Sequence, residues 1–260
     1  MESIPLPQQL KVINLGKHRD SIIIEPCWPG YGTTLANALR RVMISSLPGS
    51  AVIAVKVISA SHEFSALAGV KEDIVDIMLN LKRLRMKVHS IEPVTILLKA
   101  SGEKKVTAAD IKATSDVEII NKDLHLATLT EKKAELEMEL TVRQGRGYVP
   151  VENREKEKAE LGHIAVDAIF TPIVKVGFNI EDVRVGQTTN YDKITFDIET
   201  DGTISPQEAI QEASKILVDH FNFILTERTK TAEDNVIVVE VAEESDKKVA
   251  KKRGRPKKEI

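Results

Sequence analysis

The most informative segment of the chain runs Gly30-Tyr31-Gly32-Thr33-Thr34-Leu35-Ala36-Asn37-Ala38-Leu39-Arg40-Arg41-Val42-Met43-Ile44-Ser45-Ser46-Leu47-Pro48-Gly49. Two glycines open it, a helical pattern follows, and Pro-Gly closes it. At about 100° per residue, its apolar side chains share one face that covers about half of the helix, wider than one supporting sheet needs. Arg40 and Arg41 project near the opposite side. The pattern predicts a helix that contacts other subunits, with an apolar face made of Leu35, Ala38, Leu39, Val42, Met43 and Leu47.

A second wide-faced helix is predicted near the end of the folded region. Ser205-Pro206-Gln207-Glu208 is a capping box with proline at the first helical position, and the helix should run to about Arg228. Burial inside the core of a single chain is the alternative explanation for its apolar surface. We favour a pairing surface, because the apolar arc again exceeds half of the helix and includes Ile210, Ala213, Ile216, Leu217, Phe221 and Ile224, flanked by Phe223 and Leu225.

The remaining patterns favour an α+β fold. Residues 136–142 alternate strictly between polar and apolar, which is typical of a half-buried strand, and residues 72–84 have helical spacing. Further strands are predicted at residues 22–26, 51–60, 85–88, 93–99, 174–178 and 193–198.

The composition describes an ordinary globular protein. The chain has 260 residues, 42% of them hydrophobic, and a net charge of −2, so one large or two ordinary domains fit and no overall charge suggests nucleic acid. Cys27 is the only cysteine, which excludes an internal disulfide and fits the cytoplasm; we expect it to be a small buried side chain. We expect neither a signal peptide nor a membrane-spanning segment.

A catalytic pattern is missing from the sequence. The six histidines lack the spacing of a metal-binding pair, and no clustered aspartates form the motif that two-metal nucleotidyl transfer needs. Gly145-Arg146-Gly147 lacks the third glycine of a phosphate loop and is predicted to be a turn or bulge. We therefore expect this chain to contribute no catalytic residue, to bind no metal and to need no cofactor.

Five blocks of sequence together resemble the bacterial RNA polymerase alpha subunit family, in family order over roughly residues 10–228. The first is the glycine-initiated helical segment at residues 30–49. The others are His62-Glu63-Phe64-Ser65 with Gly69-Val70-Lys71-Glu72-Asp73-Ile74, Val106-Thr107-Ala108-Ala109-Asp110-Ile111, Gly145-Arg146-Gly147-Tyr148-Val149-Pro150, and Asp201-Gly202-Thr203-Ile204-Ser205-Pro206-Gln207-Glu208-Ala209-Ile210.

The resemblance implies a discontinuous architecture. Residues 1–50 and 172–230 would form a dimerisation domain of sheet plus two long helices. Residues 51–171 would form an inserted, mainly β domain, and residues 231–260 a flexible tail. Two copies would form a homodimer through the two wide-faced helices, with Leu35, Leu39, Val42, Met43, Ile210, Ala213, Leu217, Phe221 and Ile224 at the interface.

The resemblance also implies partners. The second-largest and largest catalytic subunits would assemble on the dimer for DNA-templated transcription, with sigma factor and other components joining indirectly. The catalytic magnesium is expected on the largest subunit. The residues that match large-subunit contacts are Arg40, Arg41, His62, Glu63, Lys71 and Asp73.

The C-terminal tail departs from the family. Alpha subunits usually carry a small DNA-binding C-terminal domain, for which this sequence leaves no room; a natural absence and a truncated chain both stay open. Every charged residue from Lys247 to Lys258 is basic, and Arg253, Gly254, Arg255, Pro256, Lys257 and Lys258 resemble an AT-hook, which binds the minor groove of A·T-rich DNA. A solvated basic tail is the alternative.

Two other functions stay open at the level of sequence. The tail could belong to a stand-alone, chromatin-like DNA-binding dimer, which would bind no large protein partner. An unrecognised enzyme would instead need a cleft with convergent polar residues.

Overall fold

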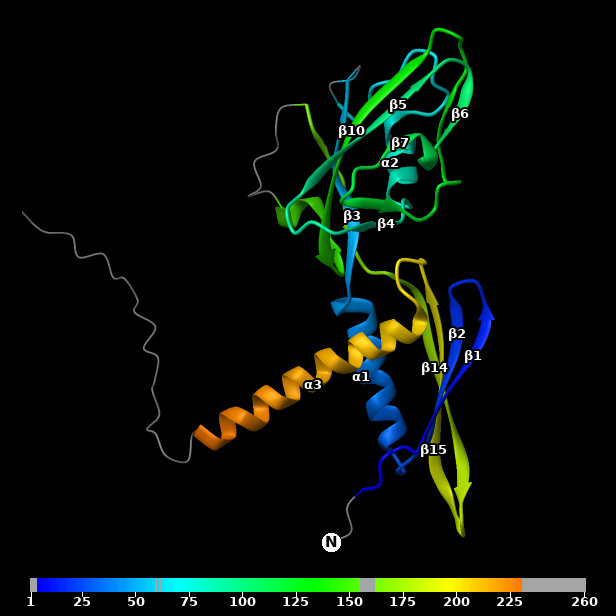
Figure 1. Ribbon diagram of the computed structural model, residues 1–260, viewed down its shortest axis with the longest axis vertical. Coiled ribbons are helices and arrows are strands. Elements are labelled where there is room, and N and C mark those ends of the chain that lie inside the picture. Colours follow the sequence, from blue (N-terminus) through cyan, green and yellow to red (C-terminus); the bar gives the residue numbers. More distant parts are fainter. Residues whose placement is uncertain (1–3, 59, 61, 155–161, 231–260) are drawn as a thin grey trace, which may run out of the picture. The chain divides into compact units, whose positions relative to one another are not determined.

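The computed structural model describes residues 4–58, 60, 62–154 and 162–230 (Figure 1). Its helices are α1 (Tyr31–Ser46), α2 (Ile74–Leu81) and α3 (Pro206–Lys230), with 3-10 turns at Ala108–Asp110 and Val151–Arg154. The strands are β1 (Gln9–Gly16), β2 (Arg19–Cys27), β3 (Pro48–Val57), β4 (Met86–Val88), β5 (Val94–Ser101), β6 (Lys104–Thr107), β7 (Ile111–Lys112), β8 (Val117–Ile119), β9 (His125–Leu129), β10 (Glu135–Arg146), β11 (Tyr148–Val149), β12 (Ile164–Ala165), β13 (Ala168–Ile169), β14 (Ile173–Val185) and β15 (Thr188–Thr200). The predicted α+β class is confirmed.

One antiparallel sheet joins the two ends of the folded region, in the strand order β1-β2-β15-β14. The central pairing places Phe196 of β15 opposite Ile22 of β2, two residues that are far apart in the sequence. Every second side chain of β15 from Ile194 to Ile198 is fully buried, because strand side chains alternate between the faces of a sheet. This buried face forms the surface on which α1 packs, beside the four strands in Figure 1.

The first core lies between this sheet and the helices. Ala36 and Met43 of α1 and Ala209 and Ala213 of α3 contribute fully buried side chains to it. The capping box predicted at the start of α3 is confirmed. The Ser205 N–H donates to Glu208 Oε2 at 2.9 Å, and the Glu208 N–H donates to Ser205 Oγ at 3.2 Å. The described chain divides into two units within α3, the first ending at Asp219 and the second beginning at His220.

A second antiparallel sheet has the strand order β12-β3-β10-β5-β7 and its own core. The alternation predicted for residues 136–142 is confirmed, since Leu136, Met138, Leu140 and Val142 are all buried on β10. Helix α2 contributes Ile74, Ile77 and Leu81 to the same core.

Some elements differ from the sequence prediction. Helix α2 covers residues 74–81 rather than 72–84, because it is followed by tight turns in which Arg83 and Leu84 donate to the third residue before them. Strand β1 was not predicted. It lies at an edge of its sheet with nearly all of its side chains exposed, so it lacks the apolar alternation that marks a half-buried strand.

Candidate subunit interfaces

The glycines that open α1 have separate structural roles. Gly30, the N-cap residue, has a φ of 83°, a left-handed conformation that glycine adopts without strain. The Gly32 N–H donates to Asp192 Oδ2 of β15 at 2.8 Å. Asp192 is only 7% exposed, and its charge is favourable near the positive end of the helix dipole. The hydrogen bond to Asp192 holds the start of α1 against the sheet.

Arg40 and Arg41 lie on the exposed side of α1. The buried side consists of Gly32, Ala36, Leu39 and Met43, whereas both arginines are exposed. Within the described part of the chain, no hydrogen bond or ion pair holds either guanidinium group. Ile44 is 40% exposed and lies three to four residues beyond the pair, which places it next to them on the helix surface. A partner protein could contact the apolar side chain of Ile44 and the guanidinium groups of both arginines at this surface.

The nine residues predicted for the dimer interface differ in exposure. Leu39, Met43, Ile210 and Ala213 are buried in the first core, and Leu35, Val42 and Leu217 are half-buried against it. Phe221 and Ile224 are exposed by 59% and 62%, and their neighbours Phe223 and Leu225 by 66% and 67%. Phe223 and Leu225 were predicted only to flank the apolar face and not to form the interface. A single chain therefore leaves four large apolar side chains exposed in the 221–225 segment.

The other four predicted contact residues lie on the connection between β3 and α2. Ser65 Oγ lies 3.2 Å from His62 Nδ1, which gives the first part of the connection a local hydrogen bond. Lys71 and Asp73 are exposed, while Glu63 is half-buried. Phe64 lies inside the His62–Ser65 block of the family resemblance but is not among the predicted contact residues; its side chain is 80% exposed.

A glycine makes the close packing of this connection feasible. Gly69 has a φ of 73°, and a Cβ atom built there would lie 2.7 Å from the Cβ of Ala134. Either property disfavours any other residue at this position. The chain at Gly69 thus lies close against the turn between β9 and β10 before α2 begins.

The glycines of Gly145-Arg146-Gly147 are explained by packing. A Cβ atom on Gly145 would lie 2.6 Å from the ring of Phe170, and Gly147 has a φ of 63°. The segment connects β10 to β11 rather than a strand to a helix. Gly145 and Arg146 end β10 in regular register, so the predicted turn or bulge is limited to a bend at Gly147. The geometry of a phosphate loop is not formed.

Cys27 is confirmed as a buried side chain. It is 1% exposed, and burial, together with the negative charge of Asp192, raises the pKa of its thiol. The thiolate is therefore disfavoured, and the environment of Cys27 is unlike that of a reactive cysteine.

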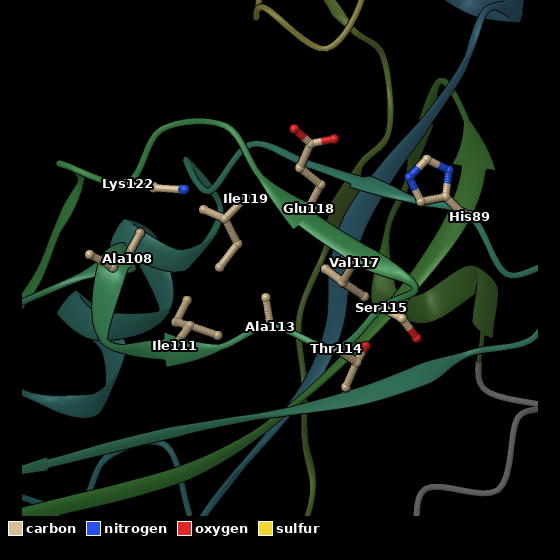
Figure 2. A pocket seen from close by; sticks show the side chains of 11 residues that line it. His89, Ala108, Ile111, Ala113, Thr114, Ser115, Val117, Glu118, Ile119 and Lys122 are labelled. Atoms are coloured by element: carbon tan, nitrogen blue, oxygen red, sulfur yellow. The ribbon is translucent and has the colours of Figure 1, made fainter.

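A shallow cleft of about 450 Å³ lies elsewhere, around the connection from β7 to β8 (Figure 2). Its floor contains Ile111, Val117 and Ile119, which are almost completely buried, and exposed polar residues such as Glu118 and Lys122 lie at its rim. None of the predicted contact residues lines it. In the described ranges, no three His, Cys, Asp or Glu side chains are grouped as ligands for a metal ion.

The predicted DNA-binding residues 253–258 lie outside the described residues, as does the rest of the tail from residue 231. Among the helices that are described, none is long and apolar enough to cross a membrane.

Comparison with known proteins gives consistent matches. Residues 53–171 match the family model of the RNA polymerase Rpb3/RpoA insert domain. The DNA-directed RNA polymerase subunit alpha of Alkaliphilus oremlandii is 47% identical over 236 residues, which cover 91% of this chain and 73% of that protein. The proteins of the same name from Clostridium botulinum and Oceanobacillus iheyensis are 48% and 47% identical, over 87% of this chain and 71% and 72% of their own lengths. Identity of this extent shows that the chain belongs to the family of bacterial DNA-directed RNA polymerase alpha subunits.

Proposed function

We propose that two copies of this alpha subunit pair into a homodimer, on which the second-largest and largest catalytic subunits assemble for DNA-templated transcription. The observation that carries the proposal is the 221–225 segment of α3, which leaves four large apolar side chains exposed in a single chain. Exposed apolar surface of this kind marks protein interfaces. Pairing of two copies would remove these side chains from water.

The discontinuous domain organisation forms part of this proposal. Residues 1–50 and 172–230 would make the dimerisation domain, and residues 51–171 the inserted domain. The two largest hydrophobic cores support this division. One contains Ile22, Met43 and Phe196, and the other contains Val52, Leu98 and Leu140. The family match at residues 53–171 falls inside the proposed insertion.

Arg40 and Arg41 are proposed to bind the second-largest subunit. Their guanidinium groups are exposed and unengaged within the described chain, so binding would not first break an internal ion pair. A planar guanidinium can bind a carboxylate or a pair of carbonyl groups with defined geometry. His62, Glu63, Lys71 and Asp73 would extend the contacts with the large subunits.

The arginine contact is tested by Arg41→Ala, which should leave the homodimer intact and weaken capture of the second-largest subunit by about tenfold. The dissociation constant would be measured with immobilised dimer and purified second-largest subunit. Lys17→Ala, which removes another exposed cation from the hairpin between β1 and β2, is the matched control. Equal affinities of the wild type and Arg41→Ala would argue against this contact.

We assign bond formation to the partner subunits. The sequence contains no clustered aspartate motif of the kind that two-metal nucleotidyl transfer needs. The resemblance to alpha subunits implies an assembly scaffold. We therefore place the catalytic magnesium on the largest subunit. We place the assembly in the cytoplasm, as the single cysteine suggests. Identity to alpha subunits over most of the chain does not favour a stand-alone DNA-binding dimer.

The basic tail is proposed to contact A·T-rich DNA upstream of promoters. Its Arg253-Gly254-Arg255-Pro256 sequence combines a close-approaching glycine, a stiff proline and two arginines suited to a narrow minor groove. Footprinting of the assembled polymerase with and without residues 247–260 tests this. Upstream protection should weaken without the tail; unchanged protection would count against the proposal.

A further inference from the structure

The carboxylate of Glu72 joins two segments that lie far apart in the sequence. It accepts a hydrogen bond from the Thr128 N–H at 2.6 Å and one from the Thr128 hydroxyl at 2.9 Å. His125 Nε2 lies 3.1 Å from the same carboxylate. Thr128 and His125 both belong to β9, so one side chain ties the entry to α2 to this strand.

Backbone contacts extend the attachment along the chain. The Lys71 N–H donates to the Thr128 carbonyl at 3.0 Å, and the Thr130 N–H donates to the Gly69 carbonyl at 2.8 Å. Val70 forms an isolated antiparallel bridge with Leu129. Residues 69–71 thus lie antiparallel beside the end of β9, joined to it by one isolated bridge and two flanking hydrogen bonds. The side chain of Glu72 completes the contact where α2 is about to begin.

Glu72 differs in exposure from the residues on either side of it. Lys71 and Asp73 are exposed, whereas the Glu72 side chain between them is only 17% exposed. Partial burial alone would raise the pKa of Glu72, but hydrogen bonds from His125 and Thr128 outweigh that effect and hold the pKa below its usual value. Glu72 therefore stays ionised at neutral pH with both oxygens engaged inside the chain.

We propose that Glu72 is a positioning residue, which holds Lys71 and Asp73 outward in the geometry that binds the second-largest polymerase subunit. The inference rests on the proposed function, because it assumes that this connection contacts a large subunit. Glu72 makes no contact with the partner itself. Its contribution is that the two flanking charges are already ordered before binding, which lowers the entropy lost on association.

The main test measures binding by full-length dimer to purified second-largest subunit. Glu72→Ala should raise the dissociation constant by about tenfold. Glu72→Gln keeps one carbonyl acceptor for the Thr128 N–H, so it should recover part of the affinity and provides a second variant if Glu72→Ala folds poorly. Glu92→Ala removes an exposed carboxylate from the loop between β4 and β5 and should change nothing.

A mutant cycle separates positioning from general destabilisation. The Lys71→Ala/Asp73→Ala variant removes the side chains that Glu72 is proposed to orient. Adding Glu72→Ala to this variant should raise the dissociation constant by less than about twofold, because no oriented contact is left to lose. Hydrogen exchange at the Lys71 amide should accelerate in Glu72→Ala, while amides of β10 keep their protection.

The outcomes distinguish this inference from the proposed function. The inference is overturned if Glu72→Ala binds as tightly as the wild type, if its effect adds fully to that of Lys71→Ala/Asp73→Ala, or if that double variant binds normally. In each of these cases the wild-type dimer still captures the second-largest subunit. Failure of the wild-type dimer to capture it would instead overturn the proposed function.

Discussion

Gly32 shows how strongly a single position is constrained by a distant one. Its N–H bonds to Asp192, and a Cβ atom built on it would lie 2.7 Å from Asp192 Oδ2 and 2.8 Å from Asp192 Cβ. Asp192 is buried, so it cannot move into solvent to relieve the overlap. Helix α1 would have to shift away from β15 to accept any larger residue.

We predict that Gly32→Ala lowers the free energy of unfolding by about 1–3 kcal/mol, the usual cost of overpacking. Gly177→Ala is the control, because a Cβ atom at Gly177 in β14 meets no atom within 4 Å. Urea titration followed by circular dichroism would measure both variants. Equal stability of the two variants would contradict the proposed role of close packing at Gly32.

At the scale of an element, α3 is specified at its start by local chemistry. Ser205 and Glu208 satisfy each other's backbone N–H groups, which would otherwise lack partners at a helix N-terminus. The hydrogen bonds from the backbone and side chain of Ser205 lower the pKa of the Glu208 carboxyl. This cap depends on four consecutive residues and on no distant contact.

Ser205→Ala should therefore destabilise the protein by about 1 kcal/mol, as expected for loss of an N-cap side chain. Ser214→Ala is the matched control within α3. The Ser214 hydroxyl bonds to the Ile210 carbonyl four residues earlier, and alanine has the higher helix propensity, so this change should cost little. Thermal unfolding of both variants checks the prediction, which is wrong if Ser214→Ala is the more damaging change.

The lowered pKa of Glu208 gives a prediction about pH. Because the folded-state pKa lies below the unfolded value of about 4.3, ionised Glu208 stabilises the fold above that pH. The stabilisation is lost as the pH falls through the lower, folded-state pKa. The difference in unfolding free energy between wild type and Glu208→Gln should thus be constant near neutral pH and shrink on acidification. A difference that grows on acidification would contradict this assignment.

At the scale of the whole molecule, some apolar residues of α3 stabilise the fold of one chain, whereas those of the 221–225 segment are exposed and available to a second chain. Leu217 is half-buried against the first core, so Leu217→Glu would combine loss of pairing with damage to the fold. Ile224 is 62% exposed and offers a cleaner test. A charge at this position costs little in a single chain and much in a buried interface.

We therefore predict that the wild type sediments as a dimer and that Ile224→Glu sediments as a folded monomer. Val174→Glu, which changes another exposed apolar side chain on β14, should stay dimeric. Sedimentation velocity gives the association state, and circular dichroism checks the fold. A dimeric Ile224→Glu would place the pairing surface elsewhere.

Local patterns made much of the secondary structure predictable. The helical spacing from Leu35 to Leu47 predicted α1, and the alternation on β10 predicted its buried face. These features depend on residues that are close together in the sequence, so the backbone preferences and side-chain periodicity of one short segment are enough to predict them. Strand β1 lacked such a signal, because an exposed edge strand needs no apolar alternation.

The sequence by itself determined the presence and approximate positions of the three helices, the cap at Ser205, the α+β class and the resemblance to alpha subunits. Only the tertiary structure decided which apolar residues are covered, since Met43 and Phe221 belong to equally apolar helix faces but are buried and exposed, respectively. It also brought Glu72 to Thr128 and Gly32 to Asp192. The physical reason is that burial and long-range hydrogen bonds depend on which distant segments pack together, and periodicity within one segment carries no information about its partner.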